Sequence, residues 1–183
     1  MGTYKFRVLL DNTTGEDIFR DIKINQDSTF LEFFDIIIQA FYFRGDQMAS
    51  FYVSNDSWDK GKEITLMDMG INEGPDAPII MSETKIKDLV LSENQKFILV
   101  YDFLKMWIFL IELVDINNEE KIDAPKIEIS IGISPDEDSK KIEMDTSFTD
   151  TSLELGDEFD DIFSEFGDEE GFGGFENIDD LDI

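Results

Sequence analysis

The side chains of this chain that could do chemistry are carboxylates, lysines, tyrosines and hydroxyls. The 183 residues include no histidine and no cysteine, which removes the Ser-His-Asp and Cys-His arrangements of nucleophilic catalysis. Zinc is left without its two most common ligand types. We therefore expect no resident metal or other cofactor, and we favour a function without catalysis.

Carboxylates supply one enzymatic alternative. Asp102 follows a predicted strand, and Asp56 and Asp59 lie in a polar loop, so that together they could hold Mg²⁺ for a metal-dependent reaction. The competing interpretation, which we favour, is that Asp102 accepts hydrogen bonds from the backbone or from a tyrosine at the end of the strand.

Aromatic residues supply candidates for recognition. Tyr101, Phe103 and Trp107 lie at the corner between two strongly apolar segments and could form a ligand-stacking corner, with Asp102 beside them as a further binding candidate. The alternative, which we favour for the aromatic rings, is that they pack in the core. Trp58 lies in the polar loop 54–61 and is the better candidate for an exposed recognition residue.

The elements that must position these residues follow from hydrophobic periodicity. The pattern predicts strands at 4–10 and 18–24 that form a hairpin, a strand at 48–53, a short edge strand at 62–66, and two central strands at 97–101 and 107–116. A helical stripe is formed by Phe30, Phe33, Phe34, Ile37, Ile38 and Phe41. Ser28 is the predicted N-cap of this helix, and residues 44–46 its predicted end.

The strand at 107–116 is apolar on both faces, with Trp107, Phe109, Ile111 and Leu113 on one and Ile108, Leu110 and Val114 on the other. Such a strand is normally central and covered on both sides. Because one helix covers one side, we expect another element to cover the second.

An isoleucine row follows Pro125, with Ile127, Ile129, Ile131 and Ile133 alternating with polar residues and glycine. This alternation predicts a half-buried strand. Pro125 before the row and Pro135 after it place that strand at an edge of the sheet.

Negative charge dominates the chain, whose formal net charge is -28, and residues 117–183 hold 23 acids but four bases. Such a chain should repel nucleic acids and anionic membranes and favour basic partners. Acids, glycines and aromatics without bases predict a disordered tail at 142–183 after a folded domain at 1–141. Without a leader or a membrane-length apolar run, we expect a soluble, cytoplasmic protein.

The tail carries its own apolar stripe, formed by Phe159, Ile162, Phe163 and Phe166 at helical spacing. Isolated helices shorter than roughly 12 to 15 residues are marginal in water, so we expect this segment to fold only when it docks. A groove on a partner and the chain's own sheet are the two destinations. The alternative is an unstructured solubilising tail.

Tyr101-Asp102-Phe103 followed by Trp107 resembles the signature of the plasmid pRiA4b ORF-3-like family, Tyr-Asp-Phe-Gly-Asp-x-Trp with a His two residues on. Residues 18–22, 39–41 and 132–138 also resemble segments of that family, and the resemblance covers about residues 4–138. It implies a small α+β fold with a β-grasp-like mixed sheet and one main helix. It also implies a link of some members to mobile elements, but no established activity.

This chain departs from the family pattern at its polar positions. Leu104-Lys105 stand where the pattern has Gly-Asp, and Phe109 stands where it has His. The family's helix is typically followed by a His-containing strand, which here begins at 47–50 without any His. If those polar residues form a site in relatives, most of it is missing here.

The leading hypothesis is therefore a non-enzymatic interaction module: an α+β domain with a β-grasp-like mixed sheet and one main helix, followed by a disordered acidic tail. It would bind an unknown protein partner that is basic or has an apolar groove, and neither nucleic acid nor membrane directly. The partner-binding candidates are Trp58, Tyr101, Asp102 and Trp107 in the domain and Phe159, Ile162, Phe163 and Phe166 in the tail. The alternatives are an acidic accessory factor or nucleic-acid mimic linked to mobile elements, and a carboxylate-based metal-dependent enzyme.

Overall fold

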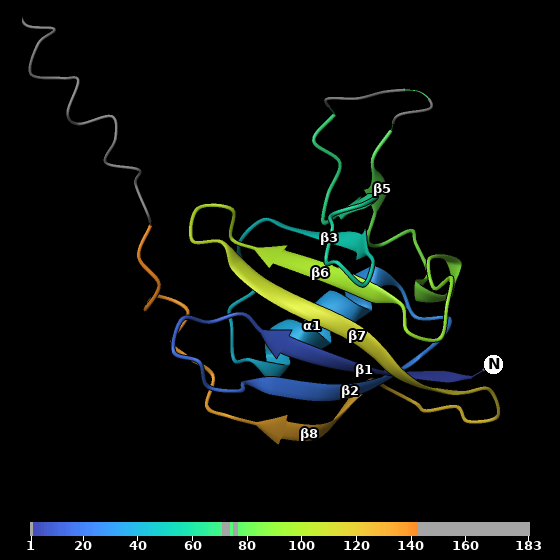
Figure 1. Cartoon of the computed structure of the whole chain (residues 1–183). Helices are drawn as coiled ribbons and strands as arrows, with labels where there is room; N and C mark the ends of the chain where they lie inside the picture. The colour runs from blue at the N-terminus through green and yellow to red at the C-terminus, as the bar shows by residue number, and fades with distance from the viewer. Residues whose placement is uncertain (1, 71–73, 75–76, 143–183) are drawn as a thin grey trace, which may run out of the picture. The chain divides into compact units, whose positions relative to one another are not determined.

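The computed structural model describes residues 2–70, 74 and 77–142. Within them, one main helix, α1 (Phe30–Ala40), packs on one face of an eight-stranded mixed sheet with the order β5-β4-β3-β6-β7-β1-β2-β8 (Figure 1). This arrangement confirms the predicted α+β fold with one main helix. None of the helices in this part of the chain is long and apolar enough to cross a membrane.

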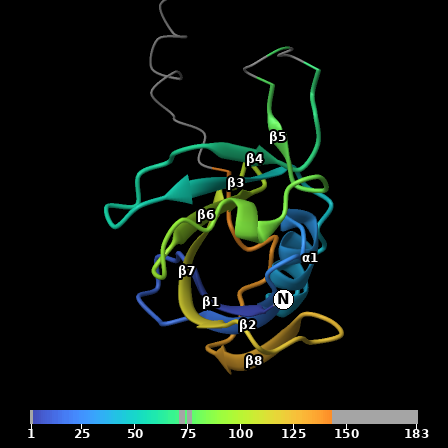
Figure 2. The ribbon, with the colours of Figure 1, turned by 90° about the vertical axis from the view of Figure 1, so that its right-hand side faces the viewer.

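The strands are β1 (Thr3–Leu10), β2 (Phe19–Asn25), β3 (Ala49–Ser54), β4 (Glu63–Thr65), β5 (Ile79–Ile80), β6 (Lys96–Tyr101), β7 (Trp107–Asn117) and β8 (Lys126–Ile131), with a short 3-10 helix at Ile86–Asp88. Paired strands run antiparallel except β4 and β5, which run parallel. β1 and β2 form the predicted hairpin, and β6 and β7 lie in the middle of the sheet. Figure 2 shows the sheet curving around α1.

Thr29 caps the start of α1, one residue after the predicted Ser28. Its hydroxyl accepts from the backbone N–H of Glu32 at 3.2 Å, and the Glu32 carboxylate accepts from the backbone N–H of Thr29 at 2.8 Å. This reciprocal capping box satisfies amides that would otherwise lack partners. The prediction of Ser28 is wrong because both hydroxyls suit the position, and only Thr29 has a glutamate three residues later.

The helix ends at Ala40, before the predicted stop. The backbone N–H groups of Tyr42 and Phe43 donate to the carbonyls of Gln39 and Ile38 at 3.2 and 3.0 Å, which is the bond pattern of a Schellman motif. Tyr42 occupies the left-handed position, with φ 60°, where glycine is the usual residue. The chain thus reverses, and Phe43 turns back into the core.

The core is a cluster of aromatic rings between α1 and the concave face of the sheet. The Phe33 ring lies 4.7 Å from the Phe6 ring and stacks on the Phe51 ring at 5.6 Å, measured between centroids. All members of the predicted helical stripe are buried: Phe30, Phe33, Phe34, Ile37, Ile38 and Phe41. At about 1.5 to 3 kcal/mol for each buried large side chain, this stripe is a main source of stability.

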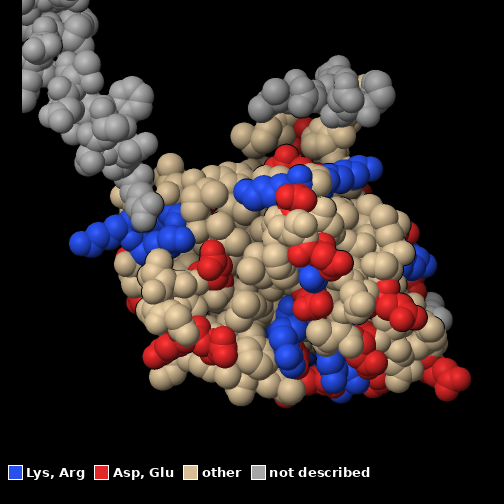
Figure 3. Space-filling model, viewed as in Figure 1, with Lys and Arg blue, Asp and Glu red and all other residues tan. Residues whose placement is uncertain are grey.

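No helix or strand of the described part covers the other face of the sheet, and the expected cover by another element, such as the tail, stays a prediction because residues 143–183 lie outside the described part. Val114 is 43% exposed, and Ile108 and Leu110 are half-buried. Cross-strand ion pairs share this face, such as Arg7 with Asp21 at 2.8 Å. Figure 3, which views this face, shows Lys and Arg side chains beside Asp and Glu within a largely uncharged surface. The second face is thus partly exposed along β7, whereas Ile98 and Val100 of β6, which pair with Leu110 and Ile108, are 4% and 1% exposed.

β8 forms an edge of the sheet as predicted, but its isoleucines are not half-buried. Ile127, Ile129 and Ile131 are 38%, 41% and 44% exposed, and Ile133, just beyond the strand, is 88% exposed. The reason is the position of the helix: α1 packs against β2, and β8 extends the curved sheet past it (Figure 2). The alternation is real, but no layer of the described part lies over it.

Candidate functional site

Four segments that are far apart in the sequence meet at one end of the domain. They are the start of β2, the end of α1, the β6–β7 turn and residues 132–138. We term residues 132–138 the strap (orange in Figure 1). The Ser134 hydroxyl donates to the Phe41 carbonyl at 2.7 Å. The Trp107 indole N–H donates to the Glu137 carbonyl at 3.3 Å. The strap therefore joins the end of the helix to the central hairpin.

Arg20 anchors the beginning of the strap from inside the fold. Its buried guanidinium donates to the carbonyls of Ala40, Ile131 and Gly132 at 3.0, 2.6 and 3.2 Å. The same group lies 4.8 Å from the centroid of the Phe41 ring, within cation–π range. Burial lowers the pKa of Arg20 from its ordinary value. Arg20, a cation on the buried side of β2, thus fastens α1 to the end of β8.

Tyr101 and Glu137 form the buried centre of the strap. The Tyr101 hydroxyl donates to Glu137 Oε1 at 2.7 Å and accepts from the Gly45 N–H at 3.1 Å, and Glu137 Oε2 accepts from the Arg44 N–H at 2.8 Å. Tyr101 is fully buried and Glu137 is 4% exposed. Burial, followed by the hydrogen bond to Glu137, raises the pKa of Tyr101 above its usual range. The pair is therefore a satisfied structural contact.

Arg44 and Lys105 fasten the far end of the strap through Asp138. Arg44 donates to both Asp138 oxygens at 2.9 and 3.2 Å, and Lys105 donates at 2.8 Å. These hydrogen bonds hold the pKa of Asp138 well below its usual range. A hollow of about 360 Å³ lies here, lined by Phe41, Tyr42, Arg44, Ser134, Pro135, Asp136, Glu137 and Asp138. Asp138 therefore already accepts from two nitrogens of the Arg44 guanidinium, although the Arg44 side chain is 50% exposed.

The β6–β7 turn (residues 102–106) is polar inside and apolar outside. Asp102 Oδ1 accepts from the backbone N–H groups of Leu104 and Lys105 at 3.0 and 3.2 Å. Asp102 and Met106 both have positive φ, 57° and 54°, which non-glycine residues adopt only where their surroundings impose it. Asp102 is buried. The structure thus favours the interpretation of Asp102 as a hydrogen-bonding residue of the turn.

Outside the turn, Phe103, Leu104 and Met106 are 44%, 70% and 38% exposed. We term these three side chains the turn tip. Trp107, by contrast, is 4% exposed and packs on Phe43 at 5.1 Å. Of the corner that the sequence indicates, the structure therefore buries Tyr101 and Trp107 and presents the residues between them.

Trp58 lies away from this end of the domain. It is half-buried, and the ammonium group of Lys96 stands 5.0 Å from its ring centroid. Its φ is 59°. Part of its aromatic face is thus already occupied by a cation of the same chain.

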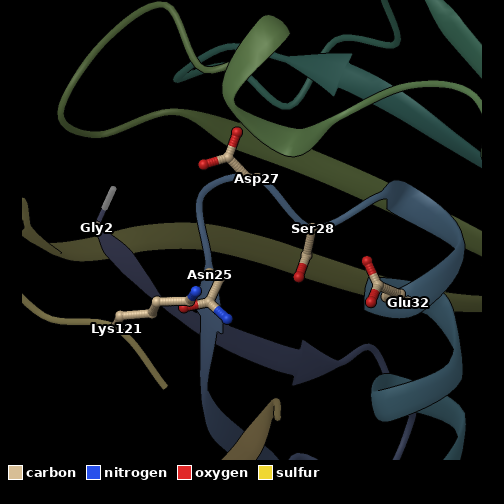
Figure 4. Close-up of a pocket in the computed structure, with 6 residues that line it drawn as sticks. All are labelled: Gly2, Asn25, Asp27, Ser28, Glu32 and Lys121. Carbon is tan, nitrogen blue, oxygen red and sulfur yellow. The ribbon is translucent and has the colours of Figure 1, made fainter. Parts of the chain in front are cut away.

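A second hollow, of about 220 Å³, lies at the opposite end of β2, lined by Gly2, Asn25, Asp27, Ser28, Glu32 and Lys121 (Figure 4). The Asn25 amide is bonded to the backbone of Ile122 at 2.7 and 3.1 Å. Glu32 completes the cap of α1, and Asp27 pairs with Lys87. Asn25, Asp27 and Glu32 thus already have partners within the fold.

Comparison with known proteins places the chain in a family. The profile of the plasmid pRiA4b ORF-3-like proteins matches residues 2–173. The chain belongs to this family. The pRiA4b ORF-3-like chain is also similar to a crystal structure of MM3350, a protein of unknown function from Methanosarcina mazei Go1, with 18% identity over 96% of this chain and 94% of that one and a TM-score of 0.63. That likeness concerns the fold. No curated protein matches the chain.

Departures from the pRiA4b ORF-3-like pattern fall on the turn and on β7. Lys105, where the pattern has Asp, reaches the strap, and Leu104, where it has Gly, is exposed on the turn tip. Phe109, where the pattern has His, is fully buried and lies 5.0 Å from the Phe41 ring. At these two positions this chain thus carries a core aromatic ring, Phe109, and a cation that fastens the strap, Lys105.

Sequence reasoning missed Arg44, Glu137 and Asp138, which are the polar partners of the corner. One signal in the sequence could have indicated two of them: Glu137 and Asp138 belong to the segment 132–138, which resembles the family. Ion pairing between such distant segments leaves no local periodicity to detect.

Two further expectations concern metal and tail. Among residues 2–70, 74 and 77–142, no three acidic side chains gather so as to hold a metal ion. Asp56 pairs with Lys96 at the start of β6, whereas Asp102 follows its end, so the alternative in which Asp102, Asp56 and Asp59 together hold Mg²⁺ is not supported by their positions. The tail candidates lie outside the described residues and stay predictions: Phe159, Ile162, Phe163 and Phe166.

Proposed function

We propose that this pRiA4b ORF-3-like protein is an interaction module that inserts its turn tip into an apolar groove of a partner protein and catalyses no reaction. The observation that supports this is the exposure of Phe103, Leu104 and Met106, at 38% to 70%, on one short turn. Clustered exposed apolar side chains mark interaction sites more often than isolated ones do.

The turn is suited to binding because its conformation is fixed before a partner arrives. Asp102 holds its backbone, Lys105 fastens it to the strap, and Lys140 donates to the Met106 carbonyl at 2.5 Å. A preorganised loop loses little conformational entropy on association. Burial of each tip side chain then contributes about 1.5 to 3 kcal/mol at most.

The net charge of this chain predicts which charges surround the groove on the partner. A net charge of -28 accelerates encounter with a basic surface and opposes an acidic one. We therefore expect an apolar groove with lysines or arginines around it. Apolar anchors determine affinity, and the charges determine the rate of association.

A photo-crosslinking amino acid at position 104 of the full-length chain tests this proposal in lysate of the source organism. Position 91 is the matched control, because Leu91 is also an exposed leucine, at 80%. We expect one protein to crosslink at position 104 but not at 91. With that protein purified, Leu104→Asp should weaken binding at least tenfold, and Leu91→Asp should leave it unchanged. Equal effects of the two substitutions would refute the turn tip as the site.

The tail hypothesis is separable in the same assay. Changing Phe159, Ile162, Phe163 and Phe166 together to Ala should abolish capture if the tail provides the anchor, and should leave it intact if the turn tip does. Salt separates a further alternative: an apolar groove holds its ligand at high ionic strength, whereas a nucleic-acid mimic that competes by charge loses its partner.

A further inference from the structure

We infer that β8 is a self-association edge, on which a second copy of this chain pairs antiparallel about a two-fold axis at Ser130. Within the described part, β8 bonds to β2 on one side and ends the sheet on the other. An edge strand offers a row of backbone donors and acceptors as a template for another strand. This surface is distinct from the turn tip, so either assignment can fail without the other.

The side chains of β8 favour an occupant that is itself apolar. Ile129 and Ile131 pair in register with Asp21 and Phe19 of β2 and therefore lie on the face that no described helix or strand covers. Both are more than 40% exposed. Antiparallel pairing centred on Ser130 would set Ile129 of each copy opposite Ile131 of the other. Cross-strand pairs of β-branched side chains stabilise the pairing of two strands.

Charge explains why the occupant can be a second copy despite a net charge of -28. Residues 126–134 carry one base, Lys126, and one acid, Glu128. Glu128 is already paired with Lys5 at 2.8 Å and with Lys23 at 3.1 Å. Two such edges can therefore approach without unpaired like charges facing each other. The repulsion between the two copies then comes from charges elsewhere in each molecule.

The topology predicts a closed pair, not a filament. At the other end of the sheet, β5 is two residues long, too short to extend a ladder. Self-pairing through one usable edge is isologous and closes with two copies. Pro125, immediately before β8, limits the shared ladder to the strand.

Light scattering on the full-length protein between about 1 and 200 μM, at low and high salt, tests the inference. We expect a monomer–dimer equilibrium that strengthens with salt, because salt screens the repulsion between two acidic molecules. Ile129→Lys should weaken the dimer at least tenfold. Val114→Lys is the matched control, since Val114 is a strand residue with 43% exposure on another part of the sheet, and it should dimerise normally.

Crosslinking tests the register. The chain has no cysteine, so Ser130→Cys introduces one thiol at the two-fold axis, where paired Cα atoms lie within disulfide range. Mild oxidation should give a covalent dimer, and Ser92→Cys, on an exposed loop, should not. Monomers across the whole concentration range would overturn the inference, as would equal dimerisation of Ile129→Lys. A dimer without the Ser130→Cys crosslink would overturn the register.

Discussion

The strap and β8 are adjacent in sequence, yet the strap buries a charged residue and β8 exposes apolar ones. In the strap, the carboxylate of Glu137 is 4% exposed, whereas in β8 the isoleucines at 127, 129 and 131 are 38% to 44% exposed. The difference arises from position. The strap crosses the end of α1 and finds partners for its polar groups, whereas β8 lies beyond the reach of the helix.

The comparison teaches that the polar groups of the strap are accounted for by hydrogen bonds within the fold, whereas nothing in the described part covers the isoleucines of β8. In the described part of the chain, no buried side-chain nitrogen or oxygen lacks a hydrogen bond. A buried carboxylate is stable only when paired and hydrogen-bonded. Glu137 meets that condition. Substitutions in the strap therefore serve as the reference with which substitutions in the edge strand β8 are compared.

Glu137→Ala should produce the largest effect. It leaves the Tyr101 hydroxyl and the Arg44 N–H without their buried acceptor, and an unsatisfied buried polar group costs about 1 to 3 kcal/mol. We expect a loss of about 3 kcal/mol in the free energy of unfolding, measured with urea. Glu119→Ala, on an exposed loop, should change it by less than about 0.5 kcal/mol. Similar values for the two variants would show that the strap contributes little.

Gly132→Ala probes the joint between β8 and the strap. Gly132 has φ 75°, and a Cβ there would stand 2.6 Å from the Asp17 carbonyl oxygen and 3.0 Å from Ile18 Cα. Gly15 is the matched control, because its φ is 73° but nothing lies within 4 Å of its Cβ position. We expect a loss of about 1 kcal/mol for Gly15→Ala from backbone strain alone and about 2 to 3 kcal/mol for Gly132→Ala. Equal losses in calorimetry would show that the joint moves freely.

Local patterns in the sequence predict most of this fold and little of this site. The stripe from Phe30 to Ile38 and the hairpin of β1 and β2 follow from periodicity, and both form as predicted. The exposure of the β8 isoleucines depends on which strands the helix packs against, and periodicity does not encode that position. The strap depends on Arg44 meeting Asp138 across 94 residues of chain.

Tyr101→Phe is a smaller change at the same centre, and its effect depends on pH. It removes the hydrogen bond to Glu137 and should cost about 1.5 kcal/mol at pH 7. The pKa of Tyr101 is raised in the folded state, so the unfolded tyrosine ionises first, near pH 10. The stabilisation is complete below that pH and declines as the pH rises toward the folded pKa.

The measurement for Tyr101→Phe is the difference in unfolding free energy between wild type and variant from pH 7 to 11. It should be constant up to about pH 10 and shrink above it. Other tyrosines titrate equally in both proteins and cancel in the difference. A gap that stays constant through pH 11 would mean that the hydroxyl does not contribute through its protonated form.

Ile129→Lys should have the smallest effect on the folded monomer, although isoleucine is typical of a core. Its side chain is 41% exposed on an edge strand, and a surface substitution away from buried contacts changes stability by about 0.5 kcal/mol or less. Urea titration at submicromolar protein, below the range where a second copy could bind, isolates this value. A loss above about 1.5 kcal/mol would place Ile129 against an apolar surface within the same molecule. The near-neutral result, combined with lost dimerisation at high concentration, would assign the isoleucine row to association, and the difference between strap and edge would then be one between folding and binding.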